Sequence, residues 1–420
     1  MLGHLDALRA VGVIAVAGAA LAAWARTGTA VPDPLRFADG RPVETGADWA
    51  ERRREILELF RSHVYGRSPS APSGVRSEVR EESRGALGGL ADRRQVRLHL
   101  GADPPVFLDL LLYTPAAAES PSPAFLALNF RGNHTIHPDP AILLPESWVP
   151  NDDALDVGDN RASAAGRGAV ASRWAVEEIL ERGYALASLY HGDVDPDYDD
   201  GFSNGVHAIA FPGEDAPPPE ERWGSIAAWA WGLSRALDHL ESEPGVDAAR
   251  VAVMGHSRLG KAALWAGAQD ERFALAISNE SGCGGAALSR RRVGETVAKI
   301  NERFPHWFSD SFTRYDDRED SLPVDQHLLL ALVAPRPLYV ASATEDGWAD
   351  PEGEFLACVH AGPVYRLLGR RDLGTSEMPE PDSPLQEGHI GYHIRSGPHD
   401  VTDFDWQAYL DFADRHLEEP

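Results

Sequence analysis

A short apolar strand, a sharp turn that carries a serine and an alanine-rich helix follow one another between Val251 and Gln269, in the sequence VAVMGHSRLGKAALWAGAQ. The apolar run up to Met254 is typical of a buried strand, and the residues after Leu259 favour a helix. A serine at such a bend, here Ser257, stands clear of the sheet, and the next backbone N–H can face a developing oxyanion. The usual pattern is G-x-S-x-G, whereas here the second glycine comes one position later, at Gly260. A strand-to-helix turn with an incidental serine is the alternative interpretation.

Strand-like and helix-like segments alternate through most of the chain. Segments near the start that alternate in strand fashion predict an antiparallel edge: Val75 to Arg84, Arg93 to Leu100 and Val106 to Tyr113. Compact apolar strands follow, at Ala124 to Phe130, Tyr184 to Tyr190, Phe273 to Ser278 and Pro337 to Ser342. Helices are expected at Asp48 to Tyr65, Trp174 to Arg182, Ile226 to Leu240 and Asp405 to Leu417. This order predicts an α/β-hydrolase fold, a three-layer sandwich with a mostly parallel central sheet.

The beginning of the chain resembles a secretory signal peptide. Arg9 precedes an almost entirely apolar, small-residue run from Ala10 to Ala25, which ends in a cleavage site of the A-x-A type. The run is shorter than the roughly 20 residues that a membrane span needs. We therefore expect residues 1–30 to be a leader, residues 31–420 to be one catalytic domain, and the protein to be secreted or periplasmic. A short N-terminal helix or a misassigned start is the alternative.

Two segments have no clear secondary-structure period. Pro138 to Arg167 is irregular, and because a loop that long in a compact domain is usually functional or disordered, we expect it to border the site. A later loop carries alternating aspartates at positions 193, 195, 197, 199 and 200. It lacks the glycine and the terminal glutamate of an EF-hand loop, so we expect a solvated acidic loop rather than a calcium site.

Composition excludes several classes of protein. The formal net charge is −26 and no stripe of Lys and Arg is present, so nucleic acid is not an expected partner. Two cysteines, Cys283 and Cys358, are too few for a disulfide-dense scaffold or a cysteine-based zinc site. We expect two free buried thiols, with one disulfide as the alternative. We predict no cofactor, no metal site, no integration into a membrane, and a monomer.

The candidates for acid–base chemistry all follow the serine in the chain. A serine hydroxyl needs a base in contact, itself oriented by a third group. His399 is the best base because it lies in a loop bracketed by Gly and Pro, just before the last predicted helix. Glu280 and Asp346 both follow predicted strands and compete to orient it, and the residues alone leave these two acids near even. The order serine, acid, histidine is that of α/β-hydrolases.

Two cations and one loop can assist the serine. Arg258, directly after Ser257, is expected to strengthen an oxyanion hole, with an ion pair to a core carboxylate as the alternative. Lys261 lies one helical turn further on and is expected to point into the same pocket. The loop from Phe130 to Asn133 either supplies a second oxyanion donor or forms a structural turn.

Beyond these local arguments, the turn Gly255-His256-Ser257-Arg258-Leu259-Gly260-Lys261 resembles the G-x-S-R-x-G-K signature of glucuronoyl esterases, carbohydrate esterase family 15, and is especially similar to their bacterial members. The likeness covers roughly Val31 to Leu417 and continues in the same order through SNESGCGG from Ser278, FPHWF from Phe304, LPVDQH from Leu322, APRP from Ala334, EDGWADP from Glu345 and GPHD from Gly397.

The resemblance implies an α/β-hydrolase that cleaves the ester between a 4-O-methyl-glucuronic acid branch of glucuronoxylan and a lignin alcohol. It also implies roles for residues: Ser257 as nucleophile, His399 as general base and Arg258 as oxyanion stabiliser. In the fungal members a cysteine in a disulfide precedes the serine, whereas this chain has His256 there, so that bond is absent.

Further positions carry over from the family. Lys261, Glu295 and Trp348 match positions that hold the hydroxyls and the ring of the sugar. Many bacterial members have the triad acid where Glu280 stands, and fungal members have it where Asp346 stands. Glu280 is therefore our first choice, with Asp346 as an alternative or auxiliary acid.

Two other functions remain open from the sequence. The first is an esterase of the same fold that acts on acetylated xylan or on another small carboxylic ester. The second is a hydrolase-like protein that only binds carbohydrate, which the presence of Ser257, His399 and two candidate acids disfavours.

Overall fold

The computed structural model describes residues 31–72, 75–102, 104–211 and 216–417, and the described residues from Pro34 onward form one compact unit. The predicted leader, residues 1–30, lies outside the described residues. Among the helices of the described segments, none is both long and apolar enough to cross a membrane.

The elements follow the alternation that the sequence predicts. The strands are β1 (Arg76–Gly85), β2 (Ala91–Ala102), β3 (Pro105–Pro115), β4 (Ser122–Asn129), β5 (Ala185–Tyr190), β6 (Val246–His256), β7 (Leu275–Asn279), β8 (Leu338–Ala343) and β9 (Ile390–Arg395). The α-helices are α2 (Gly46–Phe60), α3 (Ala86–Gly89), α4 (Val176–Glu181), α5 (His191–Val194), α6 (Ser225–Leu240), α7 (Arg258–Gln269), α8 (Val297–Arg303), α9 (Gln326–Ala331), α10 (Pro351–Leu367) and α11 (Asp403–Leu417).

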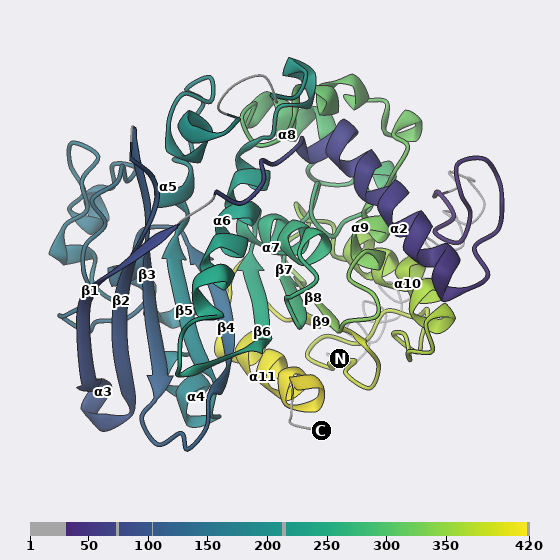
Figure 1. Cartoon of the computed structure of the whole chain (residues 1–420). Helices are drawn as coiled ribbons and strands as arrows, with labels where there is room; N and C mark the ends of the chain where they lie inside the picture. Colours follow the sequence, from purple (N-terminus) through teal and green to yellow (C-terminus); the bar gives the residue numbers. More distant parts are fainter. Residues whose placement is uncertain (1–30, 73–74, 103, 212–215, 418–420) are drawn as a thin grey trace, which may run out of the picture. The chain divides into compact units, whose positions relative to one another are not determined.

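One sheet runs through the domain in the order β1-β2-β3-β5-β4-β6-β7-β8-β9 (Figure 1). The pairs β1–β2, β2–β3 and β3–β5 are antiparallel, and every pair from β5 onward is parallel. The antiparallel edge and the parallel sheet are therefore both as predicted. Because ligands of open α/β sheets bind at the carboxyl ends of the parallel strands, this edge of the sheet is where a site is expected.

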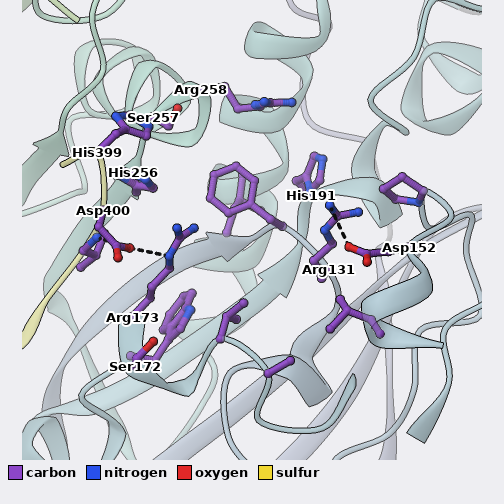
Figure 2. A pocket seen from close by; sticks show the side chains of 18 of the residues that line it. Arg131, Asp152, Ser172, Arg173, His191, His256, Ser257, Arg258, His399 and Asp400 are labelled. Carbon is purple, nitrogen blue, oxygen red and sulfur yellow. Dashed lines mark hydrogen bonds and ion pairs between the residues drawn. The ribbon is translucent and has the colours of Figure 1, made fainter. Parts of the chain in front are cut away.

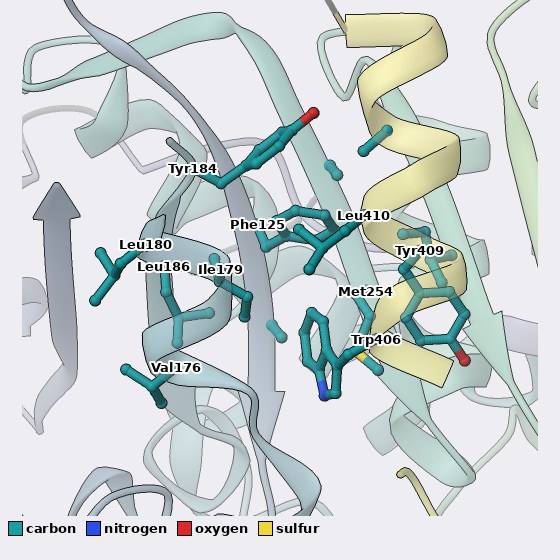
Figure 3. Packing of buried hydrophobic residues seen from close by; sticks show 14 of the residues in the cluster. Phe125, Val176, Ile179, Leu180, Tyr184, Leu186, Met254, Trp406, Tyr409 and Leu410 are labelled. Atoms are coloured by element: carbon teal, nitrogen blue, oxygen red, sulfur yellow. The ribbon is translucent and has the colours of Figure 1, made fainter. Parts of the chain in front are cut away.

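Helices cover both faces of the sheet. On one face, α4 and α11 pack on alternate residues of the parallel strands, among them Phe125, Met254 and Tyr339, with Trp406 against Phe125 (Figure 3). On the other face, α7 comes so close that a Cβ added at Gly267 would lie 2.9 Å from the Cβ of Ala276. Since side chains alternate along a strand, the two sets of contacts belong to opposite faces, which gives three layers.

The helix α10 and the strand β9 are among the elements that the sequence did not predict. The helix α10 contains Gly353, Gly362 and Pro363, residues of low helix propensity, yet burial of Phe355 and Leu356 holds it in place. The strand β9 is short and has histidine and arginine among its six buried residues. Tertiary packing overrides the local signal in both cases.

Candidate active site

Ser257 lies on a strained turn between β6 and α7. Its φ of 57° and ψ of −128° are unusual for a residue with a side chain. A Cβ added at Gly255 would come 2.0 Å from the carbonyl oxygen of Leu259, so this turn requires glycine there. At Gly260 an added Cβ would lie 3.1 Å from the Cβ of Ser281, so the displaced second glycine lets α7 approach the segment after β7. The predicted strand, elbow and helix are present.

His399 lies in the loop after β9, beside the elbow. Its ring centroid is 4.5 Å from that of His256, which immediately precedes Ser257. Its Nδ1 is 2.6 Å from Asp346 Oδ2 and 3.0 Å from Glu280 Oε2. Ionised carboxylates only accept hydrogen bonds, so Nδ1 carries the proton and Nε2 is the basic nitrogen of the neutral ring. The two acids that the sequence treats as competitors therefore meet at the same nitrogen.

The three groups shift one another's protonation. Burial works against the charge of His399, but the hydrogen bonds to Asp346 and Glu280 raise its pKa to about 9. Burial raises the pKa of Glu280 to about 7, although His399 and Arg395 oppose this. Burial acts in the same direction on Asp346, but the hydrogen bond from His399 outweighs it and lowers the pKa of that carboxyl. A neutral histidine in this setting is a strong base.

Glu280 is held from several sides. Its side chain is fully buried, and its Oε1 accepts a hydrogen bond from Arg395 Nη2 at 2.8 Å. Its Oε2 also accepts from the backbone N–H of Asp400 at 3.2 Å. Among the described residues no Arg or Lys bonds Asp346, which accepts from the backbone N–H of Ala349 at 3.3 Å. Glu280 is thus the more firmly anchored of the two acids.

Arg258 forms an ion pair with Asp197, so the alternative of a core carboxylate partner is realised. The same carboxylate accepts from His306 Nε2 at 2.9 Å and from Trp307 Nε1 at 2.8 Å. Burial opposes the charge of Asp197, but these hydrogen bonds and Arg258 lower its pKa overall. The guanidinium carbon lies 4.8 Å from the ring centroid of Trp307, and Nε of Arg258 has no hydrogen-bond partner among the described residues.

The prediction of a solvated acidic loop is wrong for its first three aspartates. Asp193 and Asp195 are buried, and Asp197 is nearly so. Asp193 accepts from the backbone N–H of Asp109 at 3.2 Å and from Ser147 Oγ, and burial raises its pKa to about 7. The carboxylates of Asp193 and Asp197 are internal hydrogen-bond acceptors. One sequence signal could have identified Asp197. Aspartates stand at every second position after the buried strand that ends at Tyr190.

A cavity of about 810 Å³ opens beside the serine (Figure 2). Ser257, Arg258 and His399 line one side of it, and residues from the 150–155 and 169–174 stretches line another. Phe130 and Arg131, from the loop expected to assist the oxyanion, also border it. Figure 2 shows two ion pairs at its wall, Arg173 with Asp400 at 2.6 Å and Arg131 with Asp152 at 3.4 Å. The irregular segment predicted to border the site contributes to this wall.

The three residues expected on the sugar side gather elsewhere. Lys261 is buried, and its Nζ donates to the carbonyls of Ser281 and Cys283 at 2.6 Å and lies 3.4 Å from Glu295 Oε2. The backbone N–H of Glu295 donates to the carbonyl of Trp348 at 2.9 Å, and the Trp348 side chain is 46% exposed. None of the three lines the cavity, contrary to the expectation for Lys261.

Within the described residues, Glu280, Asp346 and His399 form the one group of three side chains close enough to hold an ion. These atoms already bond to one another through the histidine proton, as a base and its orienting acids do. Cys283 and Cys358 are both free and buried, as predicted.

A serine on a strained elbow, beside a histidine whose other nitrogen bonds carboxylates, is the arrangement of serine hydrolases with the α/β fold.

Comparison with known proteins identifies the family within this class of serine hydrolases. A family model described as glucuronyl esterase of fungi matches residues 218–369. The chain is 50% identical to carbohydrate esterase MZ0003 of an unknown prokaryotic organism, over 92% of this chain and 89% of that protein. It is 31% identical to a 4-O-methyl-glucuronoyl methylesterase of Schizophyllum commune, over 81% of this chain and 74% of that one.

Solved structures give the same result. A promiscuous CE15 esterase from a marine bacterial metagenome has a TM-score of 0.87 at 49% identity, covering 92% of this chain and 97% of that one. The glucuronoyl esterase of Solibacter usitatus has a TM-score of 0.86 at 47% identity, covering 93% and 98%. The chain belongs to the glucuronoyl esterase family, carbohydrate esterase family 15, and is a carboxylic-ester hydrolase.

Proposed function

We propose that the protein hydrolyses esters of 4-O-methyl-glucuronic or glucuronic acid, such as those that join glucuronoxylan to lignin, through an acyl-enzyme intermediate. The observation that carries this proposal is the contact of His399 Nδ1 with two carboxylates beside the elbow serine, in a chain of this family. Several relatives of the chain are named 4-O-methyl-glucuronoyl methylesterases, which supports the substrate.

In this mechanism Ser257 attacks the uronic acyl carbon while Nε2 of His399 takes the hydroxyl proton. The imidazolium, stabilised by Glu280 and Asp346, then gives that proton to the departing alcohol. Water repeats the sequence on the acyl-enzyme and releases the uronic acid. Arg258 stabilises the developing oxyanion, and its ion pair with Asp197 fixes the guanidinium at the elbow.

We assign the two parts of the ester to different sides of Ser257. Trp348 and Glu295 form a group that suits a sugar ring and a sugar hydroxyl, and Lys261, buried and bonded to two carbonyls, holds the Glu295 carboxylate. The cavity lies outside this group and is larger than a methyl or benzyl group requires, so it suits the alcohol. An exposed aromatic ring such as Trp348 offers a flat apolar face for a pyranose.

The test compares benzyl glucuronate with benzyl acetate, using wild type and Trp348→Ala. Wild type is expected to prefer the uronate, and Trp348→Ala is expected to raise KM for the uronate roughly tenfold, the equivalent of losing about 1.4 kcal/mol of ring contact. The acetyl ester is the internal control, because it has no sugar to contact the ring. Equal changes on both esters would contradict the assigned sugar side, and activity on the acetate alone would favour the small-ester esterase.

The pH dependence of wild type tests His399 as the base. Protonated His399 cannot accept the serine proton, and its pKa is raised to about 9, so activity is lost as the pH falls through that value. We expect kcat/KM for benzyl glucuronate to rise with pH up to about 9, with Ser257→Ala as the blank for alkaline hydrolysis. Asp346→Asn should move this limb to lower pH, because it removes one hydrogen bond that favours the charged ring. A limb already flat at pH 7 would contradict this environment.

We also propose that the protein acts outside the cytoplasm as a monomer. The support for export is the apolar run of residues 10–25 in the sequence. N-terminal sequencing of the protein from the periplasm or medium of an expressing bacterium tests it, and an intact Met1 on active protein in the cytoplasm alone would overturn it.

A further inference from the structure

Arg395, the last residue of β9, is the one guanidinium in the described part of the chain that bonds both sides of the His399 loop. Its Nη2 donates to the carbonyl of Pro398 at 2.7 Å and to that of Asp400 at 2.7 Å. These are the carbonyls of the residues immediately before and after His399. The histidine therefore sits on a backbone segment that one buried side chain holds at both ends.

The same guanidinium joins the loop to the acid. Nη2 of Arg395 also donates to Glu280 Oε1 at 2.8 Å, and Nε donates to Asp405 Oδ2 at 2.9 Å. Asp405, near the start of α11, in turn accepts from the backbone N–H and the hydroxyl of Thr402 at 2.8 Å. The side chains of Arg395, Glu280 and Asp405 are at most 3% exposed. Solvent cannot replace these contacts, so each partner depends on the others for its position.

Asp346 stands outside this arrangement. It contacts the same Nδ1 as Glu280, yet in the described part of the chain it makes no hydrogen bond with Arg395. The two acids therefore differ in how they are held: Arg395 bonds Glu280 directly, whereas Asp346 is bonded by His399 and by the backbone of its own loop. Nη2 shares its two hydrogens among three acceptors while Nε serves Asp405, a planar arrangement that a lysine ammonium cannot reproduce.

We propose that Arg395 is a positioning residue that sets the place of the His399 ring relative to Ser257, by bonding both flanking carbonyls and Glu280 at once. The proposal deepens the proposed function, since it rests on His399 acting as the base of Ser257. Arg395 does not touch the substrate. Its effect is expected on the step that moves the proton, because a misplacement of about 1 Å can cost roughly 100-fold in rate.

The first variant is Arg395→Lys, which keeps a positive charge between Glu280 and Asp405. We measure kcat and KM on benzyl glucuronate and the rate at which an aryl phosphonate labels Ser257. The expected result is a roughly 100-fold fall in kcat and in the labelling rate, with KM within threefold of wild type. The labelling rate separates the two proposals: if wild type is labelled but does not hydrolyse the uronate, the substrate is wrong and Arg395 is still tested.

The matched control is Arg336→Lys. Arg336 also bonds three backbone carbonyls, those of Gly267, Asp270 and Phe273, but at the other end of β8. It is expected to lower the melting temperature without slowing labelling. A labelling rate of folded Arg395→Lys within twofold of wild type would overturn the proposal. If Arg395→Lys does not fold, the double variant Arg395→Gln with Asp405→Asn replaces it, because it removes the cation together with one carboxylate. Asp405→Asn alone is the control for this double variant. A labelling rate within twofold of that control would again overturn the proposal.

A double-mutant cycle separates positioning from general destabilisation. In a Glu280→Gln background, Arg395→Lys is expected to slow labelling less than tenfold, because part of its effect passes through Glu280. In an Asp346→Asn background the full effect should persist. Equal effects in both backgrounds would refute the link between Arg395 and Glu280.

Discussion

Replacing Ser257 with alanine is expected to reduce turnover of benzyl glucuronate by roughly 10⁵-fold or more, because the acyl-enzyme cannot form without the hydroxyl. His399→Ala should cost nearly as much, since a nucleophile and its base act as one unit. Steady-state kinetics after subtraction of the uncatalysed rate measure both.

Mass spectrometry of the reacted enzyme provides the control for this prediction. Wild type should gain the mass of the aryl phosphonate on the peptide that contains Ser257, and Ser257→Ala should gain none. Substantial turnover by Ser257→Ala would mean that another group is the nucleophile and that the elbow is only structural. Unlabelled and inactive wild type would instead favour the protein that only binds carbohydrate.

The second large effect concerns the two acids. Glu280→Gln is expected to reduce kcat more than Asp346→Asn, because Glu280 also bonds Arg395 and the backbone of Asp400 and so holds the histidine loop. Each single variant keeps one carboxylate on Nδ1 of His399. The kcat of the variant that carries both substitutions is therefore expected to be roughly 10⁴-fold below that of wild type, because its histidine has no orienting acid.

The ratio of the effects is the informative quantity. If the fold reduction of kcat in the double variant greatly exceeds the product of the two single reductions, each acid substitutes for the other. A double variant no worse than Glu280→Gln would leave Asp346 without a role in orienting the base. The reverse ranking of the single variants would make Asp346 the main acid. Circular dichroism of each variant, compared with wild type, checks that the folds are intact.

Both candidate acids lie at His399, although of the two it is Glu280 that also bonds Arg395. Glu280 and Asp346 both end up within hydrogen-bond distance of one nitrogen, although they follow different strands and are far apart in the chain. Parallel strands bring their carboxyl ends to one edge, which is why β7 and β8 deliver both acids to the loop after β9. The topology of the sheet therefore does not by itself decide which of the two acids orients His399.

The sequence by itself determined the local chemistry and the class of fold. The glycines around Ser257 encode a strained elbow, the alternating apolar strands encode a mostly parallel sheet, and the order of serine, acids and histidine follows from that sheet. These signals are legible because each depends on a few neighbouring residues, or on a period that burial imposes on every strand.

Only the tertiary structure decided which distant side chains meet. It buried Asp197 against Arg258, where the sequence suggested a solvated loop, and it directed Lys261 to Glu295 rather than into the cavity. It also brought Arg395, on a strand that was not predicted, between Glu280 and Asp405. The physical reason is that the free energy of a buried charge depends on the partners that surround it, and those partners come from other segments of the chain, 115 residues away for Arg395 and Glu280.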